Sequence, residues 1–114
     1  MQKSKTLHIL WKDDSIETSR YMVLFYATNS LLNNLWDNIT VILWGSPVKL
    51  AAENEAIQEE IKAAKHVGVK FSACLSCARR LGVIEELESH GIEVIPWVEP
   101  FTELIQGGEP IVYA

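Results

Sequence analysis

The two cysteines of the chain, Cys74 and Cys77, are three residues apart and are the side chains best suited to covalent chemistry. Val69 and Phe71 alternate with polar neighbours, which predicts a short strand before the cysteines, and the apolar spacing over 75–81 predicts a helix after it. Cys74 is therefore expected at the helix N-terminus, where exposed backbone N–H groups and the helix dipole favour a thiolate. A cysteine in this position can act as a nucleophile.

The C-x-x-C spacing is compatible with several roles. Such pairs recur in redox and metal sites, whereas a single free cysteine is often a small buried hydrophobic residue. Structural zinc normally needs four ligands, and here there is no second cysteine pair, while His8, His66 and His90 are expected on separate elements. We therefore expect no metal and no other cofactor. Cys77, one helical turn after Cys74, could form a disulfide with it or pack into the core.

Strand and helix patterns alternate along the whole chain with short connections. Strands are predicted at 6–11, 39–44, 69–72, 92–95 and 110–113, and helices at 17–34, 48–52, 54–66, 75–81, 83–90 and 99–106. This order predicts a single domain over 1–114. Its fold class is α/β, a three-layer α/β/α sandwich with a mainly parallel five-stranded sheet.

Ligands of open parallel sheets bind beyond the carboxyl ends of the strands. The residues expected there, besides Cys74, are Trp11, Trp44, Gly45, Ser46, Ala73 and Trp97. Three tryptophans at one edge with a thiol predict an aromatic cleft that binds a substrate. Hydrophobic capping of the sheet end explains the same tryptophans without a ligand.

The predicted helix 17–34 is apolar on more than one side. From Tyr21 to Leu32 its apolar residues cover more than the single stripe that a surface helix needs. Such a helix requires a second covering surface, and in a domain of this size we expect that surface to be another subunit.

Composition narrows the class of protein. The 114 residues carry a formal net charge of −5 and no visible basic stripe, which argues against a nucleic-acid partner. The apolar runs are far shorter than a membrane span, and no signal-peptide core follows the basic residues 1–5, so we expect no membrane partner and a cytoplasmic location. Thiols in that compartment are usually reduced.

Several segments resemble the DsrE/DsrF-like family, small α/β proteins of sulfur metabolism that include the Tus sulfur-relay subunits. The segments are 7–11, 41–45, 50–54, 68–78, 81–83 and 91–95, of which 68–78, containing both cysteines, is the most specific. The resemblance covers nearly the whole chain.

The resemblance implies a homo-oligomer, often a trimer or hexamer, with a sulfur-carrying cysteine after the third strand. Cys74 matches that position. In relay members the thiolate accepts sulfane sulfur as a persulfide and hands it to a partner protein, so sulfur donor and acceptor proteins are implied as partners. Cys77 departs from the one-cysteine pattern of the relay subunits, and it could resolve a persulfide on Cys74 to a disulfide.

Three functions follow as hypotheses. The first is a sulfur-relay or sulfurtransferase-like protein that carries a persulfide on Cys74. The second is a non-catalytic oligomeric protein that binds a small ligand in the tryptophan-lined cleft. The third is a dithiol redox protein that uses both Cys74 and Cys77.

Overall fold

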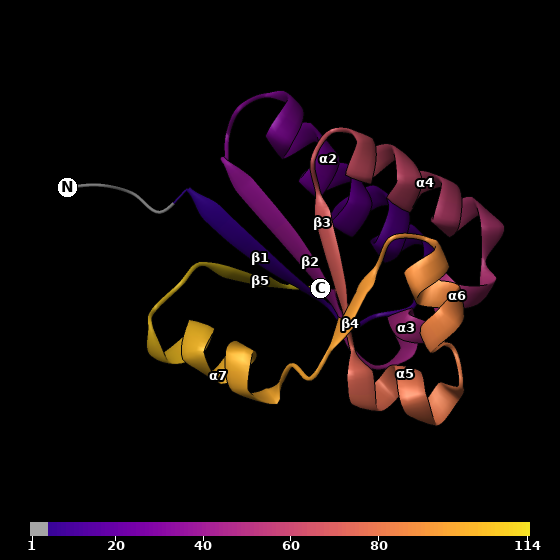
Figure 1. Cartoon of the computed structure of the whole chain (residues 1–114). Coiled ribbons are helices and arrows are strands. Elements are labelled where there is room, and N and C mark those ends of the chain that lie inside the picture. Colours follow the sequence, from indigo (N-terminus) through magenta and orange to yellow (C-terminus); the bar gives the residue numbers. More distant parts are fainter. Residues whose placement is uncertain (1–4) are drawn as a thin grey trace.

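The computed structural model describes residues 5–114 as one sheet of five parallel strands with its connecting helices (Figure 1). The strands are β1 (Thr6–Trp11), β2 (Asn38–Leu43), β3 (Lys70–Cys74), β4 (Glu93–Ile95) and β5 (Ile111–Tyr113). The helices are α1 (Ile16–Thr18), π-helical η1 (Ser19–Leu24), α2 (Phe25–Leu32), α3 (Ser46–Glu53), α4 (Glu55–His66), α5 (Leu75–Leu81), α6 (Ile84–Ser89) and α7 (Val98–Gln106). Residues 1–4 of the basic N-terminal segment lie outside the described part.

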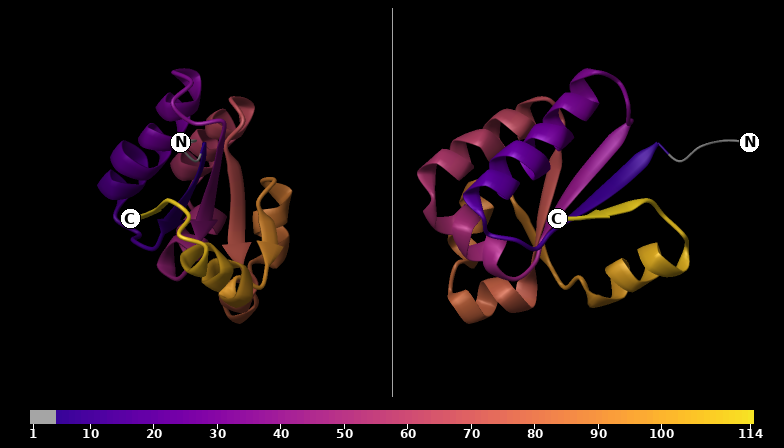
Figure 2. Two further views of the ribbon diagram at one scale, coloured as in Figure 1. Left: turned by 90° about the vertical axis from the view of Figure 1, so that its left-hand side faces the viewer. Right: turned by 180° about the vertical axis from the view of Figure 1, so that it is seen from behind.

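The strand order β4-β3-β2-β1-β5 decides which helices cover which face of the sheet. Three successive connections run from β1 to β4 in one direction, and parallel crossovers are right-handed, so α1 to α6 lie on one face. The last connection returns from β4 to β5 at the opposite edge, which puts α7 on the other face (Figures 1 and 2). The predicted three-layer sandwich is confirmed, and all four strand pairings are parallel.

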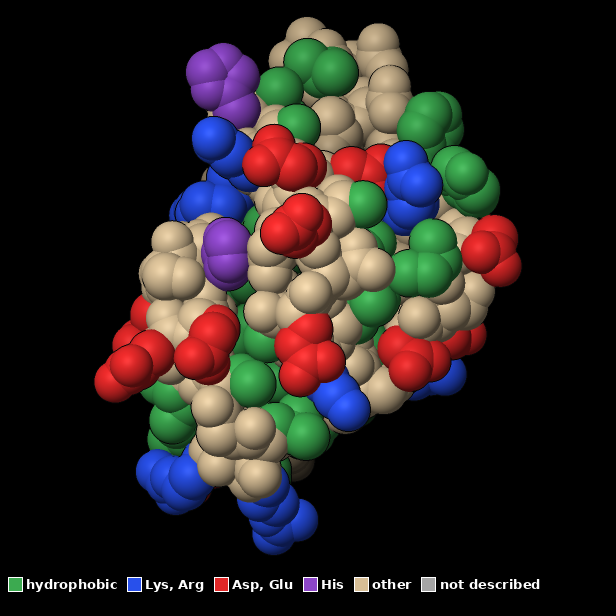
Figure 3. Space-filling model, turned by 90° about the vertical axis from the view of Figure 1, so that its right-hand side faces the viewer, with side chains coloured by type: hydrophobic (Ala, Val, Ile, Leu, Met, Phe, Trp, Pro, Cys, Tyr) green, Lys and Arg blue, Asp and Glu red, His purple; other side chains and the backbone are tan. Residues whose placement is uncertain are grey.

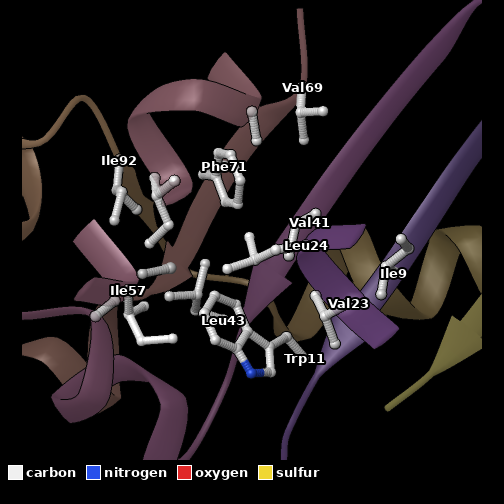
Figure 4. Close-up of a cluster of buried hydrophobic side chains, with 14 of the residues drawn as sticks. Ile9, Trp11, Val23, Leu24, Val41, Leu43, Ile57, Val69, Phe71 and Ile92 are labelled. Carbon is white, nitrogen blue, oxygen red and sulfur yellow. The ribbon is translucent and has the colours of Figure 1, made fainter. Parts of the chain in front are cut away.

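The main core lies between the sheet and helices η1 to α6. In register across the three central strands, Ile9 pairs with Val41 and Val41 with Phe71, and all three side chains point to this face. Figure 4 shows these side chains meeting Val23 from η1 and Ile57 from α4. The core therefore fixes β1, β2 and β3 against the helices that precede the two cysteines.

The opposite face of the sheet is more polar. His8, Thr40, Ser72 and Glu93 line a hollow there of about 500 Å³, beside the indole of Trp97. Burial lowers the pKa of His8, partly offset by the nearby Glu109 carboxylate, and its Nδ1 is buried without a hydrogen-bond partner among the described residues. A single nine-residue helix, α7, supplies the third layer.

The predicted helix 17–34 is interrupted by a π-helical stretch, η1. The wider turns leave Val23 buried and expose Tyr21 and Phe25. A single apolar stripe would change its position on the helix where the turns widen. Here apolar residues lie on several sides of the helix, so the sequence gives no such indication. The apolar excess predicted from the sequence is present as exposed side chains.

Helices α3 and α4 are joined rigidly at one residue. Asn54 ends α3 and caps α4, where its Oδ1 accepts a hydrogen bond of 2.9 Å from the Ile57 N–H. The amide of Gln58 donates to the carbonyls of Ala51 and Ala52, at 3.0 Å each. These bonds fix α3, which forms one wall of the cavity described below. Among residues 5–114, no helix has the length and apolarity to cross a membrane.

Candidate functional site

A cavity of about 680 Å³ opens beyond the carboxyl ends of β2 and β3. Its walls come from the loop after β1, from α3 and from α5. The lining residues are Asp14, Gly45, Ser46, Lys49, Leu50, Glu53, Asn54, Cys77, Arg80 and Leu81. The volume lies within the range of small-molecule sites, about 300–1,000 Å³, so the cavity is large enough for an organic ligand.

Gly45 makes the turn that starts the cavity wall. Its φ of +81° and ψ of −139° suit glycine alone, since a side chain would strain this conformation. The turn lets α3 begin at Ser46, with Pro47 in the first helical turn where its missing N–H costs nothing. The backbone of Gly45 is thereby brought against Cys77 of α5.

Cys77 is the thiol that lines the cavity. Its side chain is half-buried in the first turn of α5. Burial raises the pKa of the Cys77 thiol; a backbone hydrogen bond from Gly45 lowers it, and a hydrogen bond with the Cys74 thiol raises it again. Arg80, one helical turn further along, contributes a smaller lowering of the pKa of Cys77. Because burial is the largest effect, Cys77 is a neutral thiol at neutral pH.

Cys74 lies behind Cys77 and is only 3% exposed. It is the last residue of β3 and the N-cap of α5, as its position in the sequence predicts. It pairs in register with Ile95 of β4. Neither cysteine forms a disulfide, and Cys74 is close enough to raise the pKa of the Cys77 thiol. The structure therefore contains a buried thiol in contact with one that opens on a cavity.

The tryptophans do not form one rim. Trp11 is fully buried in the main core, where its Nε1 donates to the Asp13 carbonyl and to Ser19 Oγ, both at 3.0 Å. Trp97 is buried on the opposite face and donates from Nε1 to Ser72 Oγ at 2.8 Å.

Trp44 and Ala73 also lie away from the cavity lining. Half-buried Trp44 packs edge-on against Phe101 of α7, with ring centroids 5.5 Å apart. Ala73 is fully buried in the main core. Of the predicted site residues, the structure brings together Gly45 and Ser46 from the sheet edge and Cys77 around the cavity.

Two cations of the cavity were not identified from the sequence. Lys49 follows Ser46 by three residues on α3, and Arg80 follows Cys77 by three on α5. Residues three apart share a helix face, so helical spacing from the predicted residues was the available signal. Arg80 is six residues after Cys74, the expected nucleophile, and is therefore too far along the helix to be predicted as its neighbour. Among residues 5–114, no group of three or more His, Cys, Asp or Glu side chains could hold a metal ion.

Comparison with known proteins gives structural relatives of the whole chain. No model of a protein family matches the chain, and no curated protein does. MTH1491 from Methanobacterium thermoautotrophicum, a protein of unknown function, has a TM-score of 0.70 at 16% identity, covering 98% of this chain and all of that one. YchN from E. coli has a TM-score of 0.72 at 13% identity with the same coverage. At these identities the likeness establishes the fold.

A third structure is closer in sequence. BT1422 from Bacteroides thetaiotaomicron, a conserved protein of unknown function, is 35% identical to this chain with a TM-score of 0.94. The match covers 96% of this chain and 95% of that one. The chain therefore belongs to the same family as BT1422.

Proposed function

We propose that the protein is a sulfur-relay protein of the DsrE/DsrF-like type, which takes up sulfane sulfur as a cysteine persulfide and passes it to a partner. The observation that carries this proposal is a pair of thiols that form no disulfide, of which Cys77 opens on the cavity and Cys74 lies buried three residues before it. The resemblance of residues 68–78 to the relay segment of that family supports it independently.

Sulfur enters through Cys77 in this proposal. Cys77 lines the cavity, whereas Cys74 is 3% exposed and has no room to meet a bulky donor. The Cys77 thiolate attacks the terminal sulfur of a donor R–S–SH. A new S–S bond forms at Cys77 Sγ, the donor S–S bond breaks, and R–S⁻ leaves with the electron pair while the proton stays on the transferred sulfur.

Cys74 is the second residue that holds the transferred sulfur in this proposal. Its thiolate can attack the outer sulfur of the Cys77 persulfide, which moves the sulfur to Cys74 and regenerates the Cys77 thiolate. Attack on the inner sulfur instead gives a Cys74–Cys77 disulfide and releases HS⁻. The first path holds the sulfur at the position that the family resemblance assigns to the carrier. Attack of the Cys77 thiolate on the outer sulfur of the Cys74 persulfide returns it to the cavity for transfer and regenerates the Cys74 thiolate. The second ends in the dithiol chemistry expected as an alternative from the sequence.

The raised pKa of Cys77 determines how its loading should depend on pH. A smaller fraction of Cys77 is ionised at neutral pH than of a cysteine with an ordinary pKa. Each Cys77 thiolate is more nucleophilic, because nucleophilicity rises with the pKa of the thiol. Loading is therefore expected to rise with pH.

A second candidate function is ligand binding without chemistry. The burial of Cys74 favours it, because a cysteine 3% exposed can serve as core packing alone. The cavity would then bind a small molecule and the thiols would contribute only to its walls. Absence of any sulfur adduct in the experiment below would leave this function as the better account.

The first prediction concerns which cysteine is required for loading. Reduced wild-type protein and Cys74→Ala should each gain one sulfur atom in intact-mass spectrometry after incubation with a persulfide donor. Cys77→Ala should load no faster than the double variant, because the buried Cys74 cannot reach the donor.

Ser76→Ala, an exposed neighbour, is the matched control and should load as wild type. Circular dichroism checks that each variant is folded, and Cys74→Ser provides a second substitution at the buried position. Normal loading of Cys77→Ala would refute the role given to Cys77.

The second prediction concerns pH. Since burial raises the pKa of Cys77 above its ordinary value, the rate of its alkylation by iodoacetamide should keep rising beyond about pH 8.5, where an ordinary cysteine levels off. Arg80→Gln should move the plateau to higher pH, because Arg80 lowers this pKa. Peptide mass spectrometry follows the alkylation of Cys77 separately. A plateau below neutral pH would contradict the assignment.

The third prediction concerns assembly. We propose that the protein is a homo-oligomer, a trimer or hexamer, in which η1 and α2 pack against a neighbouring subunit. The apolar side chains exposed there support this: Tyr21 and Phe25 are each more than 60% exposed, with Met22 and Tyr26 beside them. Light scattering at micromolar concentration should give a multiple of the chain mass, and Phe25→Ser should reduce it. A wild-type monomer would contradict the proposal.

A further inference from the structure

Four charged side chains line the same cavity as Cys77 and are not paired with one another. Asp14 and Glu53 carry negative charge, and Lys49 and Arg80 carry positive charge. Within residues 5–114, the ion pair with a nitrogen–oxygen distance below 4.0 Å joins Arg20 to Glu60. This pair lies outside the cavity. The cavity therefore presents both signs of charge to a ligand, with each group free to bind one.

The charges stand on different walls. Lys49 and Glu53 lie one turn apart on α3, Arg80 lies on α5, and Asp14 lies in the loop after β1. Leu50 and Leu81 supply apolar surface between them. Figure 3 shows the side of the molecule with α5 and α6, where acidic and basic side chains are interspersed with hydrophobic ones. Such a lining matches a ligand that is itself charged with both signs along a short organic chain.

We infer that the sulfur donor for this site is a low-molecular-weight persulfide of an amino acid or short peptide, carrying both a carboxylate and an ammonium group. This inference rests on the proposed function. The donor's carboxylate binds at Lys49 and Arg80, and its ammonium binds at Glu53 and Asp14. The terminal sulfur is then presented to Cys77, which takes it as described above while the amino-acid thiolate leaves.

The cavity favours a small donor over a protein donor for a steric reason. Cys77 is half-buried at the wall of a hollow, so a cysteine on a folded partner would have to protrude to reach it. A free amino-acid or peptide persulfide enters without that requirement. The volume of about 680 Å³ accommodates either of these small donors.

The test compares four donors that differ in charge: the persulfides of cysteine, mercaptopropionate, cysteamine and mercaptoethanol. These carry both signs, a negative charge, a positive charge and no charge, respectively. Loading of Cys77 is followed by intact mass against donor concentration. Each rate is divided by the rate of the same donor with N-acetylcysteine, which removes differences in the leaving thiol.

We expect cysteine persulfide to load with saturation and to exceed the uncharged donor by about fivefold or more, the effect of one to two exposed ion pairs. Lys49→Gln should slow the donors that carry a carboxylate and leave cysteamine persulfide unchanged. Glu53→Gln should slow the donors that carry an ammonium and leave mercaptopropionate persulfide unchanged. Lys62→Gln and Glu59→Gln on α4, outside the cavity, are matched controls and should change none of the rates.

Two outcomes separate the inference from the proposed function. If no donor loads Cys77, the sulfur-carrier function itself fails. If all four donors load Cys77 at equal normalised rates, or if Lys49→Gln and Glu53→Gln behave as their controls, the carrier stands and the inferred donor class is overturned. The donor would then be sought among partner proteins.

Discussion

Parallel pairing of β2 with β3 determines where the cavity that contains Cys77 lies. The register sets Leu43 beside Ala73, so the segments that follow, 44–46 and 74–77, leave the sheet next to each other at the same edge. The turn at Gly45 then brings its backbone to Cys77, and the helices that start there, α3 and α5, become the walls of the cavity. A different register would separate the thiol from the wall that carries Lys49.

The same geometry gives the two thiols different exposure. Cys74 is the last residue of β3, pairs in register with Ile95 and is 3% exposed. One helical turn later the chain has left the sheet, and Cys77 opens on the cavity. Burial raises the pKa of Cys77, so little of this thiol is ionised at neutral pH. In our proposal, binding holds the donor next to Cys77, and this proximity compensates for the small fraction of the thiol that is ionised.

Most of the fold could be predicted from the sequence because its signals are local. The buried strands are apolar runs, and Gly82, a residue type that readily ends a helix, adopts the left-handed conformation at the end of α5. The side chain directions were harder. Trp11 shares its face with Leu7 and Ile9, whereas His8 lies on the other face, so this alternation was visible in the sequence. Its place at the strand end suggested a cleft, whereas its parity put it in the core.

The site was predicted in part for the same reason. Cys74 was the expected nucleophile because a helix N-cap is recognisable from the chain, but its burial depends on how the surrounding elements pack, which no local pattern reveals. The cations of the cavity follow helical spacing from Ser46 and Cys77, and only the fold shows that α3 and α5 face each other. The π-helical η1 left no sequence signal of its own.

The most direct test of the account is to locate the transferred sulfur as a function of time. Wild-type protein is exposed briefly to a persulfide labelled at its terminal sulfur, quenched with an alkylating agent and digested. Fragment ions of the peptide that contains both thiols then assign the label. The account predicts label on Cys77 at the earliest times and on Cys74 later. Label on Cys74 from the start, with none on Cys77, would contradict it.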